Sequence, residues 1–432
     1  MLLKSILTAI VALAVAQDTS TSTSESSSSD SSSSSDSILS SSSTTALSTS
    51  NVASGGDYVT GTYVSYTSTV LLGGTSNIYI AAGPTLTRNA SSPSPSVARL
   101  GNTSPCNGYS SFCNRKYSNI TMVAAHNAPF RVRHNIASNQ MFDLSTMLND
   151  GIRMLQFQVH KPNDTSPLLL CHTSCDILNV GTLVDYLTTV RQWLERNPYD
   201  VITILMGNYD VLSPQNFVAP VVNSGLLEYA YTPPTVPMSL ASWPTLGEMI
   251  LSGKRVVFML DYGADQTSIP WLLDEFGQMW ETPFSSTNRD FICVVDRPPY
   301  QNRDESLDRM YMANHNLNVE LSFGSFNLLV PAFPLLYETN AVAGYGSAGA
   351  QVTGCTSDWG RPPNFLLVDY YNLGNFNGSI FQVAADANGV SYSRNQCCIR
   401  GQRVFDGARS TTDSNPRWSI MLASIVSWLL YA

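Results

Sequence analysis

Short apolar runs recur along the middle of this 432-residue chain, and polar side chains follow directly after several of them. Seven runs have the length of a buried strand and lie at 122–125, 152–159, 168–170, 201–206, 256–260, 291–295 and 365–368. An eighth strand is expected between 301 and 363, with 325–330 as the candidate. Because strands that alternate with helices form parallel sheets, the pattern predicts an α/β fold, a (β/α)8 TIM-type barrel.

Amphipathic segments between these runs predict helices at 140–149, 182–196 and 245–253. An Asp-Gly pair closes the first helix. The other two begin with pairs spaced as in a capping box, Thr182 with Asp185 and Thr245 with Glu248.

The candidate functional residues share one position, the C-terminal part of a predicted strand. They are His126, Asn127, Gln156, Gln158, His160, His172, Asp261, Tyr262 and Asp369. In a barrel these strand ends meet at one mouth, so side chains far apart in the sequence are expected to face one pocket. Two histidines on separate strands suit proton transfer, since an imidazole takes or gives a proton near neutral pH. Phosphodiester cleavage needs such a pair, one group to deprotonate the attacking hydroxyl and one to protonate the leaving oxygen. His134 and His315 lie in polar, loop-like stretches and receive no role.

The two ends of the chain differ in composition from the middle. Residues 1–16 have the pattern of a signal peptide, and 17–56 form a Ser/Thr-rich stretch expected to be a disordered stalk. Residues 57–100 predict a small β appendage and linker, and 101–405 the barrel. Residues 406–432 combine a polar spacer with an apolar tail, as in a glycosylphosphatidylinositol (GPI) attachment signal, with an ordinary terminal helix as the alternative. We therefore expect a secreted protein held on the outer cell surface.

Charge and cysteine content narrow the function classes. The formal net charge of -9, with 13% charged residues and no basic cluster, argues against nucleic acid. Eight cysteines behind a signal peptide predict disulfides, with zinc as the rival interpretation. Cys106 with Cys113, and Cys171 with Cys175, are expected local pairs; the adjacent cysteines at 397 and 398 are expected to have separate partners, with those at 293 and 355 as candidates. Five Asn-x-Ser/Thr sequons are also typical of a secreted surface; they begin at Asn89, Asn102, Asn119, Asn163 and Asn377.

Three short motifs carry a family resemblance. Ala125-His126-Asn127, Gly151-Ile152-Arg153 and Cys171-His172-Thr173, in this order, resemble the phosphatidylinositol-specific phospholipase C X domain and, more closely, secreted fungal PLC-like phosphodiesterases. The similarity runs from about 107 to 369. It implies that His126 is the base that activates the inositol 2-hydroxyl, and that His172 is the acid that protonates the diacylglycerol oxygen.

The chain departs from the family pattern at three positions. Asn127 stands where bacterial members have Asp, and Gln156 and Gln158 stand where eukaryotic members place calcium-binding carboxylates, so no calcium or other cofactor is expected. Bacterial members also hold the phosphate with an arginine at the position of Gln158. We expect a protonated His160, on the same strand face, to substitute for it.

The resemblance bears on four further residues. Asp261, Tyr262 and Asp369 end strands where the family places headgroup-binding and histidine-partner carboxylates; hydrogen bonding at the barrel end is the alternative for each. Arg153 lies on the opposite strand face from Gln156 and is interpreted as structural.

Three interpretations of the function remain open. The first is a monomeric phosphoric diester hydrolase that acts at a membrane surface on a phosphoinositol-type lipid or glycolipid. The second is a catalytically weak or inactive surface protein that uses the barrel as a binding scaffold. A barrel glycosidase with Asp261 and Asp296 as paired carboxylates is a third.

Overall fold

The computed structural model describes residues 70–71, 105–323, 326–395 and 397–398. The predicted signal peptide, the stalk and the apolar tail lie outside these residues. Of the predicted β appendage, the structure describes β1 (Val70–Leu71), which pairs antiparallel with β7 (Thr235–Val236). In the part of the chain that is described, no helix has the length and apolar character needed to cross a membrane.

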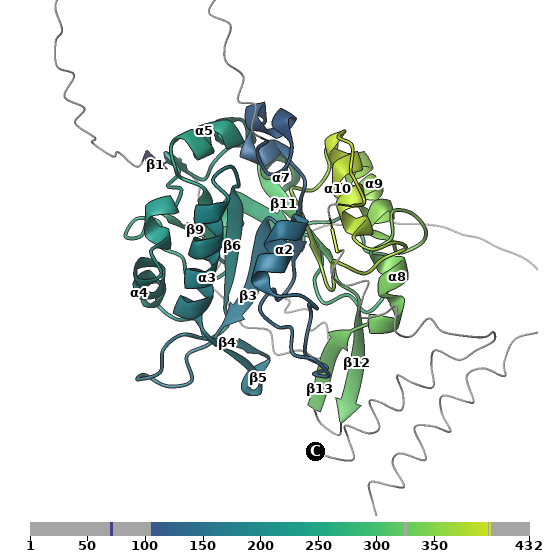
Figure 1. Cartoon of the computed structure of the whole chain (residues 1–432), viewed down its shortest axis with the longest axis horizontal. Helices are drawn as coiled ribbons and strands as arrows, with labels where there is room; N and C mark the ends of the chain where they lie inside the picture. Colours follow the sequence, from purple (N-terminus) through teal and green to yellow (C-terminus); the bar gives the residue numbers. More distant parts are fainter. Residues whose placement is uncertain (1–69, 72–104, 324–325, 396, 399–432) are drawn as a thin grey trace, which may run out of the picture. The chain divides into compact units, whose positions relative to one another are not determined.

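A curled, eight-stranded parallel sheet forms the centre of the fold (Figure 1). Its strands are, in spatial order, β10 (Met279–Glu281), β11 (Met310–His315), β14 (Phe365–Val368), β2 (Met122–Ala125), β3 (Met154–Val159), β6 (Ile202–Asn208), β8 (Val256–Leu260) and β9 (Leu272–Asp274). All seven pairings are parallel. The last and first strands of this order, β9 and β10, are joined by the short helix α6 (Glu275–Gln278). The fold is therefore the predicted (β/α)8 type, open along one seam between β9 and β10.

Helices cover the outer face of the sheet, with α3 and α4 on one side and α9 and α10 on the other (Figure 1). Their bounds are α2 (Leu144–Asp150), α3 (Leu183–Arg196), α4 (Gln215–Asn223), α5 (Leu246–Leu251), α7 (Arg303–Leu307), α8 (Leu336–Thr339), α9 (Ala348–Trp359) and α10 (Ser379–Asn388). The caps predicted for the second and third helices are present: Thr182 accepts from Asp185 N, and Thr245 forms a full capping box with Glu248. The first predicted helix starts four residues late, because Asp143 caps it by accepting from Thr146 N.

Two of the seven predicted strands, and the candidate for the eighth, do not belong to the barrel sheet. The run at 168–170 overlaps β4 (Leu169–His172), which pairs antiparallel with β5 (Ser174–Thr182). Of the candidate 325–330, the described residues 326–330 fall in β13 (Phe326–Pro331), which pairs antiparallel with β12 (Asn318–Phe323). Both pairs are hairpins at the lower end of Figure 1, outside the barrel sheet. Residues 291–295 lie in irregular structure. The eighth strand was expected between 301 and 363, and β11 lies in that range, whereas the barrel strands β9 and β10 were not predicted.

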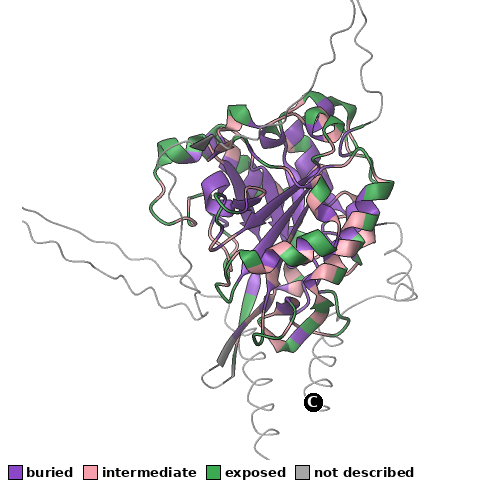
Figure 2. Cartoon of the chain, turned by 90° about the vertical axis from the view of Figure 1, so that its left-hand side faces the viewer, coloured by how far each residue is buried: buried purple, intermediate pink, exposed green. Residues whose placement is uncertain are grey.

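Alternation along the strands separates an apolar barrel interior from a polar mouth. The interior cluster takes one residue in two from each strand, and its members include Met122, Ala124, Met154, Val257, Met259, Leu273, Met279, Met310, Met312, Phe365 and Leu367. The next inward positions toward the C-terminal ends are polar: His126, Gln156, Asp261, Glu281, Asn314 and Asp369. Figure 2 shows the strands buried and the exposed residues gathered on the surrounding helices. The fold thus places a ring of polar side chains above a packed core.

Four disulfides are present among the described residues. Two are the predicted local pairs, Cys106–Cys113 and Cys171–Cys175. The other two correct the prediction, because Cys293 pairs with Cys355, and the adjacent Cys397 and Cys398 pair with each other. The irregular segment at 291–295 packs against α9, which brings Cys293 to Cys355 and leaves the other two cysteines to one another.

Candidate active site

His126 follows β2 and is held by the neighbouring strand β14. The register pairs Ala125 with Val368, so the residues that follow them, His126 and Asp369, meet at the barrel mouth. His126 Nδ1 lies 2.8 Å from Asp369 Oδ1. Because a carboxylate accepts hydrogen bonds, Nδ1 carries a proton and Nε2 is left for chemistry. Asn139 donates to the same Asp369 oxygen at 2.8 Å and fixes the carboxylate.

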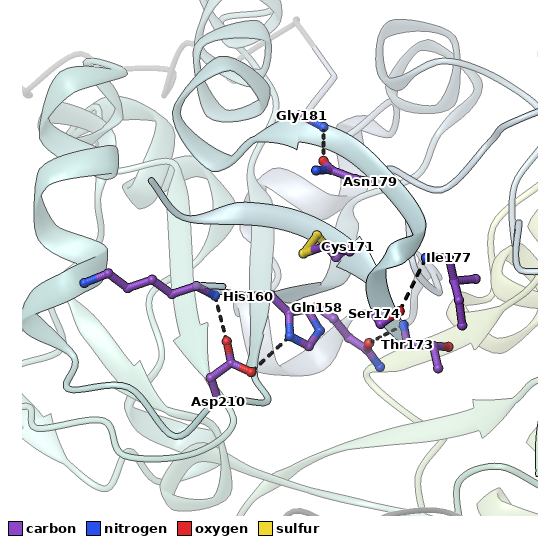
Figure 3. Close-up of a disulfide and its surroundings, with 11 residues drawn as sticks. Gln158, His160, Cys171, Thr173, Ser174, Ile177, Asn179, Gly181 and Asp210 are labelled. Carbon is purple, nitrogen blue, oxygen red and sulfur yellow. Dashed lines mark hydrogen bonds and ion pairs between the residues drawn. A yellow bond between two sulfur atoms is a disulfide. The ribbon is translucent and has the colours of Figure 1, made fainter. Parts of the chain in front are cut away.

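His172 reaches the same site from the turn of the β4–β5 hairpin. Its Nδ1 donates to the carbonyl oxygen of Ala137 at 2.5 Å, and its ring stacks on Phe130 with centroids 5.1 Å apart. The Cys171–Cys175 disulfide closes the turn that carries it (Figure 3). Burial lowers the pKa of His172 to about 4, and the hydrogen bond to Ala137 opposes only part of this effect. His172 is therefore neutral in the ligand-free protein at neutral pH.

The Asn127 side chain joins the two histidines. Its Nδ2 lies 3.1 Å from His126 Nε2 and 3.2 Å from His172 Nε2. Asn127 is 1% exposed, and its backbone N–H donates to Gln156 Oε1 at 2.9 Å. The Nε2 atoms of the two histidines consequently converge on one amide group.

His126, His172 and Asp369 are each followed by a residue with a left-handed backbone. Asn127, Thr173 and Tyr370 follow His126, His172 and Asp369 and have φ angles of 48°, 66° and 44°. Asparagine tolerates this region, whereas a β-branched or bulky residue is strained in it, at a cost of about 1–3 kcal/mol. Such strain is retained where the surrounding structure enforces it, which is common at active sites.

Gln156 and Gln158, expected to contact substrate, support the loops of the two histidines. Gln156 Oε1 accepts from Asn127 N, and Gln158 Oε1 accepts from Thr173 N at 3.4 Å (Figure 3). Neutral amides with oxygens engaged in this way do not fit a calcium site, which needs several free oxygen ligands. Contact of either glutamine with substrate stays a prediction.

His160, at the end of the inward face of β3, forms a second Asp–His pair. Its Nδ1 lies 3.0 Å from Asp210 Oδ1, and Lys161 N donates to the other carboxylate oxygen at 2.7 Å (Figure 3). The ring is buried, and its Nε2 has no hydrogen-bond partner among the residues that the structure describes.

Carboxylates dominate the opposite arc of the barrel mouth. Burial raises the pKa of Asp261 to about 6, although Asn208 N donates to it at 2.6 Å. Arg297 Nε donates to the buried Glu281 at 2.8 Å, and Arg297 Nη1 contacts the Tyr262 hydroxyl at 3.5 Å. Burial, followed by the negative charge of Glu281, raises the pKa of Glu275 well above its usual value. Asp261 and Tyr262 thus lie at the mouth as predicted, beside three charged residues that the sequence did not single out.

The remaining predicted residues divide into structural and surface positions. Arg153 is structural as predicted, since it pairs with Asp200 at 2.8 Å. His315 was wrongly placed in a loop: it ends β11, is buried, and bonds to Gln351 Oε1 and Thr339 O, each at 2.7 Å. Asp296, half of the glycosidase pair, is exposed in irregular structure.

Sequence reasoning missed Asn139, Ala137 and Asp210, which hold Asp369, His172 and His160 in place. These residues lie in loops and act partly through backbone atoms, so no periodic pattern marks them. As for metals, the one cluster of potential ligands within the described residues is Asp150 with Cys397 and Cys398, and both of these sulfurs belong to a disulfide.

Comparison with known proteins finds one matching family model and two similar fungal sequences. A family model described as PI-PLC X matches residues 112–382. An "Uncharacterized secreted protein" of Arthroderma benhamiae is 53% identical over 82% of this chain and 79% of its own length. A "PI-PLC X domain-containing protein 1" of the same organism is 40% identical over 62% of this chain and 86% of its own length.

Solved structures of bacterial phosphatidylinositol-specific phospholipases C have a similar fold at low identity. A double mutant of the S. aureus protein matches with a TM-score of 0.43 at 15% identity, over 64% of this chain and 94% of that chain. The Listeria monocytogenes protein matches with a TM-score of 0.42 at 13% identity, over 64% and 95%.

Proposed function

Since the chain belongs to the PI-PLC X family, we propose that it is a phosphoric diester hydrolase that uses His126 and His172 as base and acid. The observation that carries the proposal is the convergence of the two Nε2 atoms on the Asn127 amide, with each Nδ1 anchored by a different element. Two imidazoles held in this way suit proton transfer to and from one substrate group.

The proposed reaction is an internal displacement at phosphorus. His126 Nε2 removes the proton of the inositol 2-hydroxyl while that oxygen attacks phosphorus. The bond from phosphorus to the diacylglycerol oxygen breaks, and a protonated His172 Nε2 gives its proton to that oxygen. The products are a cyclic inositol phosphate and a diacylglycerol, and Asp369 stabilises the imidazolium that forms at His126.

We propose a phosphoinositol-type lipid or glycolipid as the substrate. Asp261 and Tyr262 face the barrel mouth from the arc opposite the histidines and are assigned to the hydroxyls of the headgroup. His160 is assigned to the phosphate. Its Nδ1 is held by Asp210, and its Nε2, which has no hydrogen-bond partner among the described residues, is buried on the strand face that carries Gln156 and Gln158.

We further propose that the protein is secreted and works at a membrane surface. Its disulfides and its 53% identity to a secreted protein support secretion. Near His172, the loop that contains Ala137 exposes Arg131, Val132 and Arg133, a pairing of positive and apolar side chains suited to an anionic lipid surface. The GPI anchor remains a prediction from the sequence.

The test is turnover of phosphatidylinositol and of a GPI lipid by the purified secreted chain, in the presence of a chelator. His126→Ala and His172→Ala are each expected to lower kcat by at least about 10²-fold, as loss of a general acid or base does. His134→Asn, which changes an exposed histidine and keeps the left-handed backbone, is expected to retain the activity. His160→Gln is expected to raise KM about tenfold through loss of a charged hydrogen bond.

The second candidate function is a binding scaffold without catalysis. It is favoured by Gln158, a neutral residue engaged with Thr173 at the position where bacterial members carry an arginine. Turnover by the wild-type chain no higher than that of the two histidine variants, on both lipids, would support the scaffold and reject the hydrolase.

A further inference from the structure

The hydrogen bonds around the two candidate catalytic histidines determine where their protons lie. His126 Nδ1 faces a carboxylate and His172 Nδ1 faces a carbonyl, and both of these groups only accept. Each neutral ring therefore carries its proton on Nδ1 and a lone pair on Nε2. Two lone pairs consequently point at the same place, the side chain of Asn127.

Only one orientation of the Asn127 amide suits this arrangement. Its NH2 group has two hydrogens, one for each Nε2 lone pair, at nitrogen–nitrogen distances of 3.1 and 3.2 Å. Rotation of the amide by half a turn would place Oδ1 against both lone pairs. Oδ1 instead points away, is buried, and has no hydrogen-bond partner among the described residues. A buried amide oxygen without a hydrogen bond is unfavourable, so the two contacts of Nδ2 must be what holds the Asn127 side chain in this orientation.

We propose that Asn127 is a positioning residue that holds both histidines as neutral bases in the ligand-free protein, so that His172 becomes an acid only when the anionic phosphodiester enters the site. The proposal rests on the proposed hydrolase function. It adds that His172 is neutral before the substrate binds and protonated once the substrate is bound.

The charges that surround His172 agree with this division. Burial is the largest effect against its protonated form, and a proton on His126 or His160 would add to it by repulsion. The negative charge of Asp369 acts in the opposite direction and favours the protonated form. Ala137 O and the Phe130 ring, which pack directly on the imidazole, carry no charge. A phosphodiester brings one negative charge beside Nε2 and thereby favours protonation there.

The protons balance over one cycle. On substrate binding His172 Nε2 takes one proton from solvent, and the Asn127 amide loses that contact. In the displacement this proton passes to the leaving oxygen, while His126 Nε2 receives the proton of the attacking hydroxyl. His126 then returns a proton to solvent, and Asn127 again donates to two lone pairs.

The experiment is a 15N NMR titration of the histidine rings in the full, ligand-free chain. In the wild type, Nε2 of both His126 and His172 should have the chemical shift of an unprotonated nitrogen at neutral pH. Asn127→Asp keeps the shape and the left-handed backbone but presents a negative acceptor, so it should raise the pKa of His172 by about 1 unit or more. Asn127→Gly keeps the backbone and removes the amide, and it should give a smaller increase. The exposed His134, observed in the same spectra, is the internal reference.

The proposal is overturned if either Nε2 carries a proton in the wild type at neutral pH, or if both variants leave the titration of His172 unchanged. Because the titration uses no substrate, it decides the role of Asn127 even where the lipid assay rejects the hydrolase. If turnover is observed, Asn127→Asp should also move the pH profile of kcat/KM toward higher pH, since the acid form persists further into the alkaline range.

Discussion

At the residue scale, Asp369 decides which nitrogen of His126 is available. Its carboxylate accepts from Nδ1 at 2.8 Å and is itself held by Asn139 at 2.8 Å. An amide in place of the carboxylate would present an NH2 group to Nδ1 or lose the charge that stabilises the imidazolium. The tautomer of His126 therefore depends on one buried oxygen.

Asp369→Asn should accordingly lower kcat by about 10²- to 10⁴-fold and change KM little. The measurement is steady-state kinetics on lipid vesicles. The matched control is Asp200→Asn, which breaks a comparable pair with Arg153 away from the site and should lower the melting temperature but retain kcat. Equal losses of kcat in the two variants would contradict the role assigned to Asp369.

The sequence predicted much of the site at this scale because strand ends converge. His126, Asn127, His172 and Asp369 all meet, although 243 residues separate His126 from Asp369. Residues that act from loops were not predicted, since a backbone carbonyl such as that of Ala137 is chemically the same at every position. Only the fold reveals which one lies beside a ring nitrogen.

At the scale of elements, the β4–β5 hairpin is the part that sequence reasoning described least well. An apolar run of three residues looks the same whether it enters a barrel or a hairpin, because periodicity records burial and not the pairing partner. The same ambiguity misplaced 325–330. The strands β9 and β10 escaped detection because each has only three residues. The long helix α3 and the strand β2, with clear caps or sharp apolar limits, were predicted correctly.

The hairpin also makes the position of His172, the proposed acid, dependent on a disulfide. Replacement of Cys171 and Cys175 together by serine should lower kcat/KM by at least about tenfold, because the turn that presents His172 gains freedom. The matched control replaces Cys106 and Cys113, a disulfide of similar loop length beside the barrel core. Both variants should lose about 2 kcal/mol of unfolding free energy.

Urea titration and lipid hydrolysis, measured on the same two preparations, separate stability from function. At urea concentrations well below the unfolding midpoint, only the variant that lacks the Cys171–Cys175 disulfide should have lost activity. A parallel loss of activity in both would mean that the Cys171–Cys175 disulfide acts through global stability alone.

At the scale of the whole molecule, two histidines, the buried His315 and the half-buried His172, make folding sensitive to acid. Burial lowers the pKa of His172 and of His315 to about 4 in each case, below the ordinary value of 6.5. A lowered histidine pKa gives stability that is present above 6.5 and lost as the pH falls toward 4. Asp261 acts in the opposite sense, since its pKa is raised to about 6 and its contribution is lost as the pH rises through that value.

The melting temperature should therefore fall between pH 6.5 and pH 4, where the histidines take up protons. For the fully buried His315 the effect is on the order of 3 kcal/mol. Calorimetry across this range checks the trend, and His315→Gln should flatten the curve while lowering its upper end, because two hydrogen bonds are affected. If the melting temperature of His315→Gln falls with pH as steeply as that of the wild type, His315 is not the source of the acid sensitivity.

The open seam between β9 and β10 affects the tendency of the protein to aggregate. A closed barrel has no sheet edges, whereas this one has two, and an exposed edge is a template to which a foreign strand can add and start aggregation. Here both edge strands are only three residues long, and α6 between them is buried. The carboxyl groups of Glu275 and Glu281 are buried at the same gap. Natural sheets prevent the addition of a foreign strand by short edge strands, by a segment that covers the edge and by charged side chains that point inward. All three features are present at the gap between β9 and β10, so this open edge of the barrel is protected against aggregation.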